Sequence, residues 1–173
     1  MKSMPSLTGT FLVARPVLVD SNFSQTVVLI LSHGEEGAYG FVVNRPLPAK
    51  DLPLPVYSGG PCESPGMIML HGHVEWVETG EGGSTVGNRE VIPGVYIGDA
   101  ECMSRASTPT PGLAFRYRIF EGYSGWGPGQ LEQEIAAGAW TLAPATAQLL
   151  FDIPPEDLWS RLRPRTIPEP SVN

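Results

Sequence analysis

The chain has 173 residues, of which 42% are apolar and 17% charged, and its formal net charge is −7. This length and composition are typical of one globular domain that buries a substantial core, and they exclude an intrinsically disordered chain. The 20 glycines and 18 prolines divide the chain into many short elements, which excludes a helical bundle or a coiled coil. We predict one domain over residues 1–163 and a Pro-rich, disordered tail over residues 164–173.

Strand signals dominate the first two thirds of the chain. Residues 26–31 are apolar on both alternating faces, which indicates a buried central strand, and a short glycine-containing loop joins them to residues 39–44 in a predicted hairpin. Pro46 ends that second strand because proline has no N–H to donate to a ladder. The remaining predicted strands are residues 10–14, 56–58, 67–71, 91–98 and 113–123.

Helix signals appear mainly after the strands. Asp99 suits the N-cap of a short helix that ends near residue 107. Pro128 suits a first helical turn and Gly138 the position just past a helix end. Short helices are therefore predicted between these last two residues and at residues 144–151 and 155–162. Strands before helices predict an α+β single domain with a large mixed, mostly antiparallel sheet and short helices concentrated in the C-terminal third.

The cysteine count and the hydropathy pattern bear on the compartment. Only two cysteines occur, Cys62 and Cys102, fewer than a secreted disulfide scaffold carries. The apolar run at residues 11–14 is too short for a signal peptide, and no stretch approaches the roughly 20 apolar residues that span a bilayer. We expect a cytoplasmic protein with reduced thiols and no membrane association.

The charge distribution argues against nucleic acid as a partner. Residues 61–138 hold four arginines against ten carboxylates. Neutralising phosphates requires clustered lysine and arginine. The one basic group, Arg161, Arg163 and Arg165, lies beside the Pro-rich end, where we interpret it as a solvated terminus. Direct DNA binding is not expected.

Several motifs resemble the YqgE/AlgH family, and the strongest is Gly122-Tyr123-Ser124-Gly125-Trp126 followed by Gly129-Gln130-Leu131-Glu132. The other matching motifs are Leu7-Thr8-Gly9, Arg15-Pro16, Asp20, Phe23, His33, Gly37-Ala38-Tyr39-Gly40, Val43-Asn44-Arg45-Pro46, Gly59-Gly60-Pro61, Leu70-His71, Trp140 and Leu158-Trp159. The resemblance runs from about residue 7 to residue 162. It implies a large, barrel-like mixed sheet in a family whose biochemical activity is not established and whose members are often labelled transcriptional regulators.

Loops at strand ends carry the candidate binding residues, because such loops often hold functional sites. Arg45 suits an anion or carboxylate clamp, and aromatic residues between glycines suit stacking on a planar group. The alternative is structural: the glycines form tight turns and the aromatic side chains fill the core. We favour the structural interpretation for residues 122–130 but predict Trp126 at or beside a cleft, partly buried, in a loop that depends on Gly125 and Gly127. The candidate ligand or partner residues are Asn44, Arg45, Gly59, Gly60, His71, Tyr123, Trp126 and Gln130.

No pattern for metal or nucleophilic chemistry is strong. His71 and His73 share one face of a strand, but zinc needs further converging ligands, and C-x-x-C and H-E-x-x-H are absent. A Cys62 nucleophile with His71 as its base is disfavoured because Glu63 adjoins the thiol. No G-x-S-x-G motif occurs. We assign no catalytic residue, metal or cofactor.

Three functions remain in competition at this point. The preferred one is a cytoplasmic binding or regulatory module that holds a small molecule or a protein in a cleft between strand-end loops. The first alternative is an enzyme of unrecognised chemistry that uses the same cleft, which would show as convergent titratable groups. The second is a transcriptional regulator, which would need a basic face and an element that enters a DNA groove.

Overall fold

A computed structural model describes residues 6–16, 23–47, 56–73, 90–98 and 117–163. The predicted helix at 99–107, residues 113–116 and the tail at 164–173 lie outside these described residues. The described strands are β1 (Thr10–Ala14), β2 (Val27–Gly34), β3 (Gly37–Val42), β4 (Val56–Ser58), β5 (Cys62–His71), β6 (Glu90–Ile92), β7 (Val95–Gly98), β8 (Tyr117–Trp126) and β9 (Trp140–Pro144). The described helices are α3 (Gln130–Ala136), α4 (Ala147–Phe151) and α5 (Pro155–Leu162).

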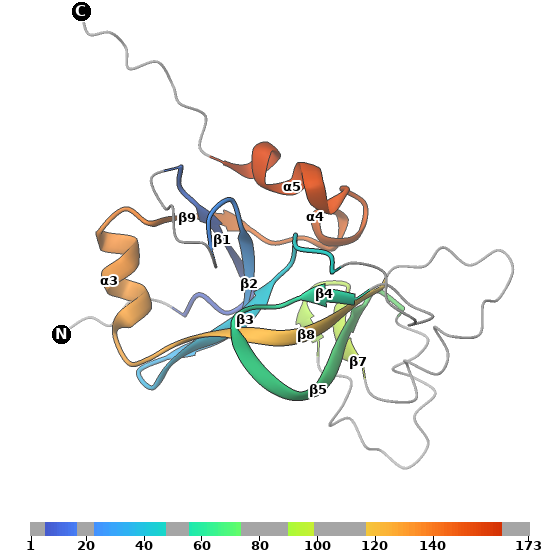
Figure 1. The fold of residues 1–173 in the computed structure, drawn as a ribbon, viewed down its shortest axis with the longest axis horizontal. Helices are drawn as coiled ribbons and strands as arrows, with labels where there is room; N and C mark the ends of the chain where they lie inside the picture. Colours follow the sequence, from blue (N-terminus) through green and yellow to red (C-terminus); the bar gives the residue numbers. More distant parts are fainter. Residues whose placement is uncertain (1–5, 17–22, 48–55, 74–89, 99–116, 164–173) are drawn as a thin grey trace, which may run out of the picture.

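The strands form one sheet in the order β6-β7-β5-β8-β3-β2-β1-β9, with β4 beside β8. The β4–β8 pair is parallel and every other described pair is antiparallel. The sheet curls into a half-barrel, and α4 and α5 lie together, apart from α3 (Figure 1). The predicted α+β fold with a mixed, mostly antiparallel, barrel-like sheet and short C-terminal helices is therefore confirmed.

One predicted hairpin is confirmed, and a second hairpin stands where a single strand was predicted. β2 and β3 pair antiparallel and are joined by a turn at Glu35-Glu36. Gly37, the first residue of β3, has a φ of 125°, a conformation that glycine adopts readily. Residues 91–98 were predicted as one strand; β6 and β7 instead pair antiparallel around Pro93-Gly94 and form the second hairpin. In both cases a glycine in or directly beside the turn accompanies the change of direction.

Four further elements, β5, β8, β9 and α4, differ from the prediction. β5 begins at Cys62 and not at Met67. β8 continues to Trp126, so most of the predicted glycine-aromatic loop is strand; Gly122, with φ 80°, accommodates the irregularity inside it. Residues 140–144 form β9, and the helix predicted at 144–151 is shorter, covering Ala147–Phe151. The proline at the end of β9 is tolerated because the strand lies at an edge of the sheet.

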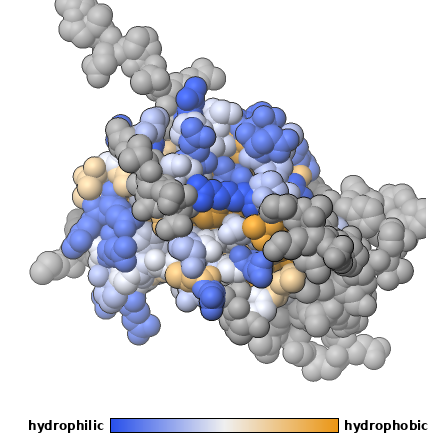
Figure 2. Space-filling view, in the orientation of Figure 1, coloured by the Kyte–Doolittle hydropathy of each residue, from blue (hydrophilic) through white to orange (hydrophobic). Residues whose placement is uncertain are grey.

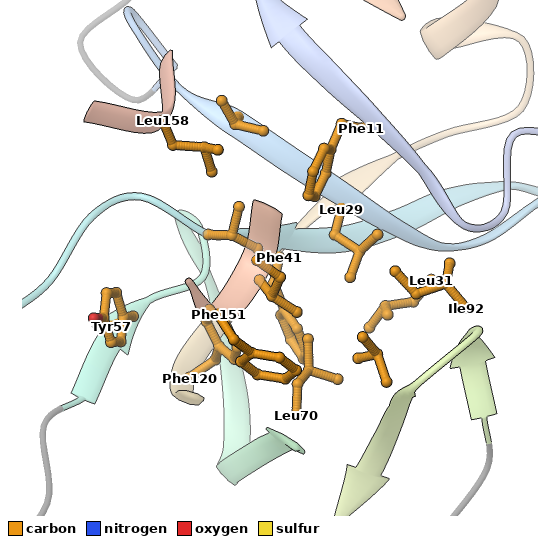
Figure 3. Packing of buried hydrophobic residues seen from close by; sticks show 14 residues of the cluster. Phe11, Leu29, Leu31, Phe41, Tyr57, Leu70, Ile92, Phe120, Phe151 and Leu158 are labelled. Carbon is orange, nitrogen blue, oxygen red and sulfur yellow. The ribbon is translucent and has the colours of Figure 1, made fainter. Parts of the chain in front are cut away.

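The core has two main clusters, one on each face of the β1–β3 region. β2 contributes alternate residues to both: Val27, Leu29 and Leu31 to the first, Val28 and Ile30 to the second. This confirms the buried central strand predicted from its apolar faces. The first cluster also contains Phe41 stacked on Phe120 at 4.8 Å, with Phe151 and Leu158 from the C-terminal helices (Figure 3). The second contains Leu12, Trp126, Leu131 and Trp140.

Candidate functional site

The Gly59-Gly60-Pro61 segment carries the chain across β8. β4 pairs with residues 119–121 of β8 on one side and β5 pairs with the same residues on the other, so the connection must cross the strand. A Cβ on Gly59 would meet the carbonyl oxygen of Gly122, and one on Gly60 would meet the carbonyl oxygen of Tyr123. Glycine is required at both positions because two backbones touch there. Chain crossing therefore explains this motif without a ligand.

Hydrogen bonds fix this crossing in place. The Gly59 amide donates to the Glu121 carbonyl at 2.9 Å, and the Gly59 carbonyl accepts from the Val42 amide at 2.8 Å. The buried Ser124 hydroxyl donates to the same Gly59 carbonyl at 3.0 Å. The crossing is a rigid platform because its backbone groups are bonded to β3 and β8.

Asn44 and Arg45 lie beside this platform, at the open end of the β2–β3 hairpin. The Asn44 Oδ1 atom accepts from the Val27 amide and its Nδ2 atom donates to the Gln25 carbonyl, both at 2.9 Å. The Arg45 guanidinium donates to the Ser24 carbonyl at 2.9 Å, and the Arg45 carbonyl accepts from the Ser58 amide at 2.9 Å. Asn44 is therefore used in closing the hairpin, whereas Arg45 lies between two chain segments.

A small hollow of about 70 Å³ opens where these segments meet, lined by Val42, Arg45, Ser58, Gly60 and Pro61. Sites for drug-sized molecules measure about 300–1,000 Å³, so this hollow has room for one small group rather than for a cofactor. The face of the molecule seen in Figure 2 shows hydrophobic side chains in small areas between hydrophilic ones. The hollow is the place where two of the predicted strand-end loops come together.

Trp126 and Gln130 lie in a different cluster, between β8 and α3. Trp126 is 6% exposed, and its indole N–H donates to the Glu134 carboxylate at 3.0 Å; the Trp140 indole donates to the same oxygen at 2.9 Å. Gln130 donates to the second Glu134 oxygen and accepts from the Gly127 amide, both at 3.0 Å. These contacts attach α3 to the sheet and favour the core interpretation of Trp126 over a partly buried place beside a cleft.

The predicted dependence on Gly125 and Gly127 has no support in the backbone. Neither residue has a positive φ. A Cβ added to either glycine would lie no closer than 3.4 Å to another heavy atom, which is an ordinary contact distance. Gly122 and Gly129 are the residues of this stretch with positive φ, at 80° and 75°. Tyr123 is half-buried and packs against the first core cluster, with Cys62 as its strand partner.

His71 lies far along β5 from the crossing. Cys62 begins this ten-residue strand and His71 ends it, so the strand itself separates a thiol from its proposed base. His71 is fully buried, its Nδ1 atom accepts from the His73 amide at 3.1 Å, and its ring lies 5.6 Å from that of Tyr96. Among the described residues, no three His, Cys, Asp or Glu side chains gather as a metal site would require.

One polar pair was not singled out by the sequence as a site. The His33 Nδ1 atom accepts from the Leu7 amide at 2.9 Å, and Nε2 lies 3.1 Å from a Glu132 carboxylate oxygen. The backbone amide of Glu132 and, less strongly, His33 hold the pKa of that carboxyl below its ordinary value by hydrogen bonding. The pair connects the N-terminal segment, β2 and α3. In the sequence, His33 alone pointed to this pair. Its partner Glu132 lies 99 residues away, so spacing along the chain could not identify it.

The described part of the chain thus forms a half-barrel α+β domain in which glycines pack two backbones together beside a small polar hollow. No helix in that part is long and apolar enough to cross a membrane. A family model described as AlgH-like matches residues 11–169, and the chain belongs to this family, as its motifs predicted.

Relatives of similar length support this assignment. A UPF0301 protein of Streptomyces coelicolor is 38% identical, over 92% of this chain and 86% of that protein, and one of Nitrosococcus oceani is 34% identical, over 92% and 89%. The solution structure of the AlgH protein of Pseudomonas aeruginosa superimposes with a TM-score of 0.68 at 29% identity, covering 93% of this chain and 90% of that one. A Corynebacterium diphtheriae protein has the same fold, with a TM-score of 0.68 at 23% identity over 97% and 92%.

Proposed function

We propose that this protein is a cytoplasmic binding or regulatory module whose ligand or partner presents one small anionic group to the hollow beside Arg45. The observation that carries this proposal is the convergence of the loop at residues 44–46 with the crossing at residues 58–61 around that hollow. The two cysteines of the chain are consistent with a reducing compartment.

The chemistry of the lining determines the kind of group. Arg45 is the charged residue of the lining, and a guanidinium pairs with carboxylate or phosphate oxygens through directed N–H donors. Gly60 also lines the hollow, and it belongs to the crossing that is held in place by β3 and β8. A volume of about 70 Å³ suits a carboxylate or a phosphate group at the end of a larger molecule.

The composition of the lining also separates a binding function from an enzymatic one. Of the five described residues around the hollow, Arg45 alone is ionisable, and its guanidinium stays charged in proteins. General acid–base catalysis needs a group that gains and loses a proton near the working pH. The binding interpretation requires no such group, and it is the one we adopt.

An NMR titration of the full chain with sodium acetate and with sodium phosphate, at ionic strength held constant with chloride, tests the proposal. We expect saturable amide shifts centred on residues 45 and 58–60 with at least one probe, and their loss in Arg45→Gln. Arg161→Gln is the matched control, since Arg161 is an exposed arginine of α5. Shifts that are absent with both probes, or that persist in Arg45→Gln, would contradict an anion site at the hollow.

A further inference from the structure

The strand β9 forms an edge of the sheet, because among the described strands it pairs with β1 alone. The Arg15 amide donates to the Ala139 carbonyl at 2.9 Å, and hydrogen-bonded pairs alternate along an antiparallel ladder. The register therefore turns the main-chain groups of Thr141 and Ala143 toward β1. Those of Trp140, Leu142 and Pro144 face away from the sheet, and within the described residues no hydrogen bond reaches them.

This outward edge is complementary to itself. If two copies of β9 pair antiparallel about a two-fold axis at Leu142, each Leu142 lies opposite the other, and each Trp140 lies opposite a Pro144. The two Leu142 residues exchange N–H···O=C bonds, and each Trp140 N–H reaches the facing Pro144 carbonyl. The N–H that proline lacks falls at the ends of this pairing, where it leaves the central bonds intact.

The side chains agree with this register. Leu142 is 46% exposed, the most exposed of the large apolar side chains in the described residues. It lies opposite Leu12 of β1, on the face of the second core cluster. Directly paired residues share a face of a sheet, so the two Leu142 side chains would cover each other on the axis.

We propose that a second copy of this chain binds along β9, so that two half-barrel sheets join edge to edge across a two-fold axis at Leu142. A two-fold contact closes on itself, whereas pairing β9 with the opposite edge strand β6 of another copy would leave edges open for further addition. β6 also has only three residues, Glu90–Ile92. β9 has only five residues, so the contact is small beside the roughly 1,000 Å² of a stable interface and we expect the dimer to be reversible.

Sedimentation equilibrium of the full chain over a wide concentration range tests the dimer. Leu142→Pro removes an N–H that is not bonded to β1, so the monomer keeps its hydrogen bonds between β1 and β9. The central hydrogen bonds between the two copies are lost, and we expect dimerisation to weaken at least tenfold. Pro144→Ala supplies an N–H facing the Trp140 carbonyl of the other copy, and we expect dimerisation to strengthen severalfold. Met67→Ser is the matched control, because Met67 is similarly exposed but lies on β5.

Circular dichroism checks the fold of each variant. Should Leu142→Pro fail to fold, Leu142→Lys keeps the N–H and places two like charges on the axis, and it must abolish the dimer. A wild-type chain that stays monomeric at every concentration overturns the proposal. If the wild type, Leu142→Pro and Pro144→Ala associate equally, the proposal is also overturned, because the dimer then forms through another surface.

A cross-link tests the register. Leu142→Cys, with Cys62 and Cys102 replaced by serine, would place two thiols on residues whose Cα atoms are about 5.5 Å apart, within the range of a disulfide. We expect rapid formation of a disulfide dimer on mild oxidation. Ala143→Cys in the same background is the control, because residue 143 faces the first core cluster. Faster cross-linking of the control would overturn the two-fold axis at Leu142.

Discussion

Replacing Trp126 with alanine distinguishes a core residue from a ligand platform. Trp126 is 6% exposed, and its ring lies 6.0 Å from that of Phe23 and 6.1 Å from that of Trp140. An aromatic side chain buries about 150–250 Å². At about 25 cal/mol/Å², that area corresponds to roughly 4–6 kcal/mol. Partial collapse of the site lowers the cost, so we expect Trp126→Ala to reduce the free energy of unfolding by about 4 kcal/mol.

Urea denaturation at 25 °C measures this loss as a lower midpoint with an unchanged slope. Trp126→Phe is the matched variant, because it keeps an aromatic ring at this position but removes the indole N–H that Glu134 accepts together with part of the ring system. We expect it to cost about 1–2 kcal/mol. A loss below about 2 kcal/mol for Trp126→Ala would refute the packing argument, because a well-packed core tryptophan costs at least about 3 kcal/mol to truncate.

Three other outcomes can be measured independently. Gly60→Ala forces a Cβ against the Tyr123 carbonyl at a φ of 149°, and we expect the free energy of unfolding to fall by more than about 4 kcal/mol or the chain not to fold. Gly34→Ala is the control: Gly34 has open space around it, and its substitution should change the free energy of unfolding by less than about 0.5 kcal/mol. The lowered pKa of Glu132 stabilises the fold above the ordinary carboxyl pKa, near 4.3, and this contribution is lost as the pH falls through the folded value. The Tm difference between wild type and Glu132→Gln should therefore shrink between pH 5 and pH 3, and a constant difference would contradict it. Fluorescence anisotropy with duplex DNA at physiological salt should detect no sequence-dependent binding near about 10⁻⁸ M, because the chain carries −7; binding of that strength, lost on adding salt, would contradict the charge argument.

The fold was predictable where one local signal decided the structure. Two such signals are the apolar run on both faces of β2 and the proline that opens α5, and each specifies its element within a few residues. Residues 91–98 were predicted as one strand, and the Pro-Gly turn makes them a hairpin. β9 was missed because Trp140–Pro144 ends in a proline that also suits a helix start, and only its pairing with β1 makes it a strand. The length of β8 was missed for a similar reason, since glycines that mark a loop in isolation are tolerated inside a strand that another backbone crosses.

The candidate site was predictable only in part, because proximity in the sheet depends on long-range pairing. Loops 44–46 and 58–61 meet because β3 and β4 both lie beside β8. His71 is the last residue of β5, and this ten-residue strand carries it away from the crossing. Spacing along the chain could not distinguish His71 from residues 44–46 and 58–61, because the distance between strand ends depends on which strands pair.

Most of the polar side chains in the matching motifs have partners inside the fold, and this determines how their substitution should be interpreted. Asn44 holds two backbone groups of the β2–β3 hairpin, and Gln130 bonds to Gly127 and Glu134. Changing either residue removes bonds that the folded state uses, so a loss of function there would follow from a loss of stability. Arg45 differs because it lines the hollow as well as donating to the Ser24 carbonyl. A loss of anion binding larger than the change in Tm accounts for is therefore expected at Arg45 and not at Asn44 or Gln130, and that contrast distinguishes a binding residue from structural ones.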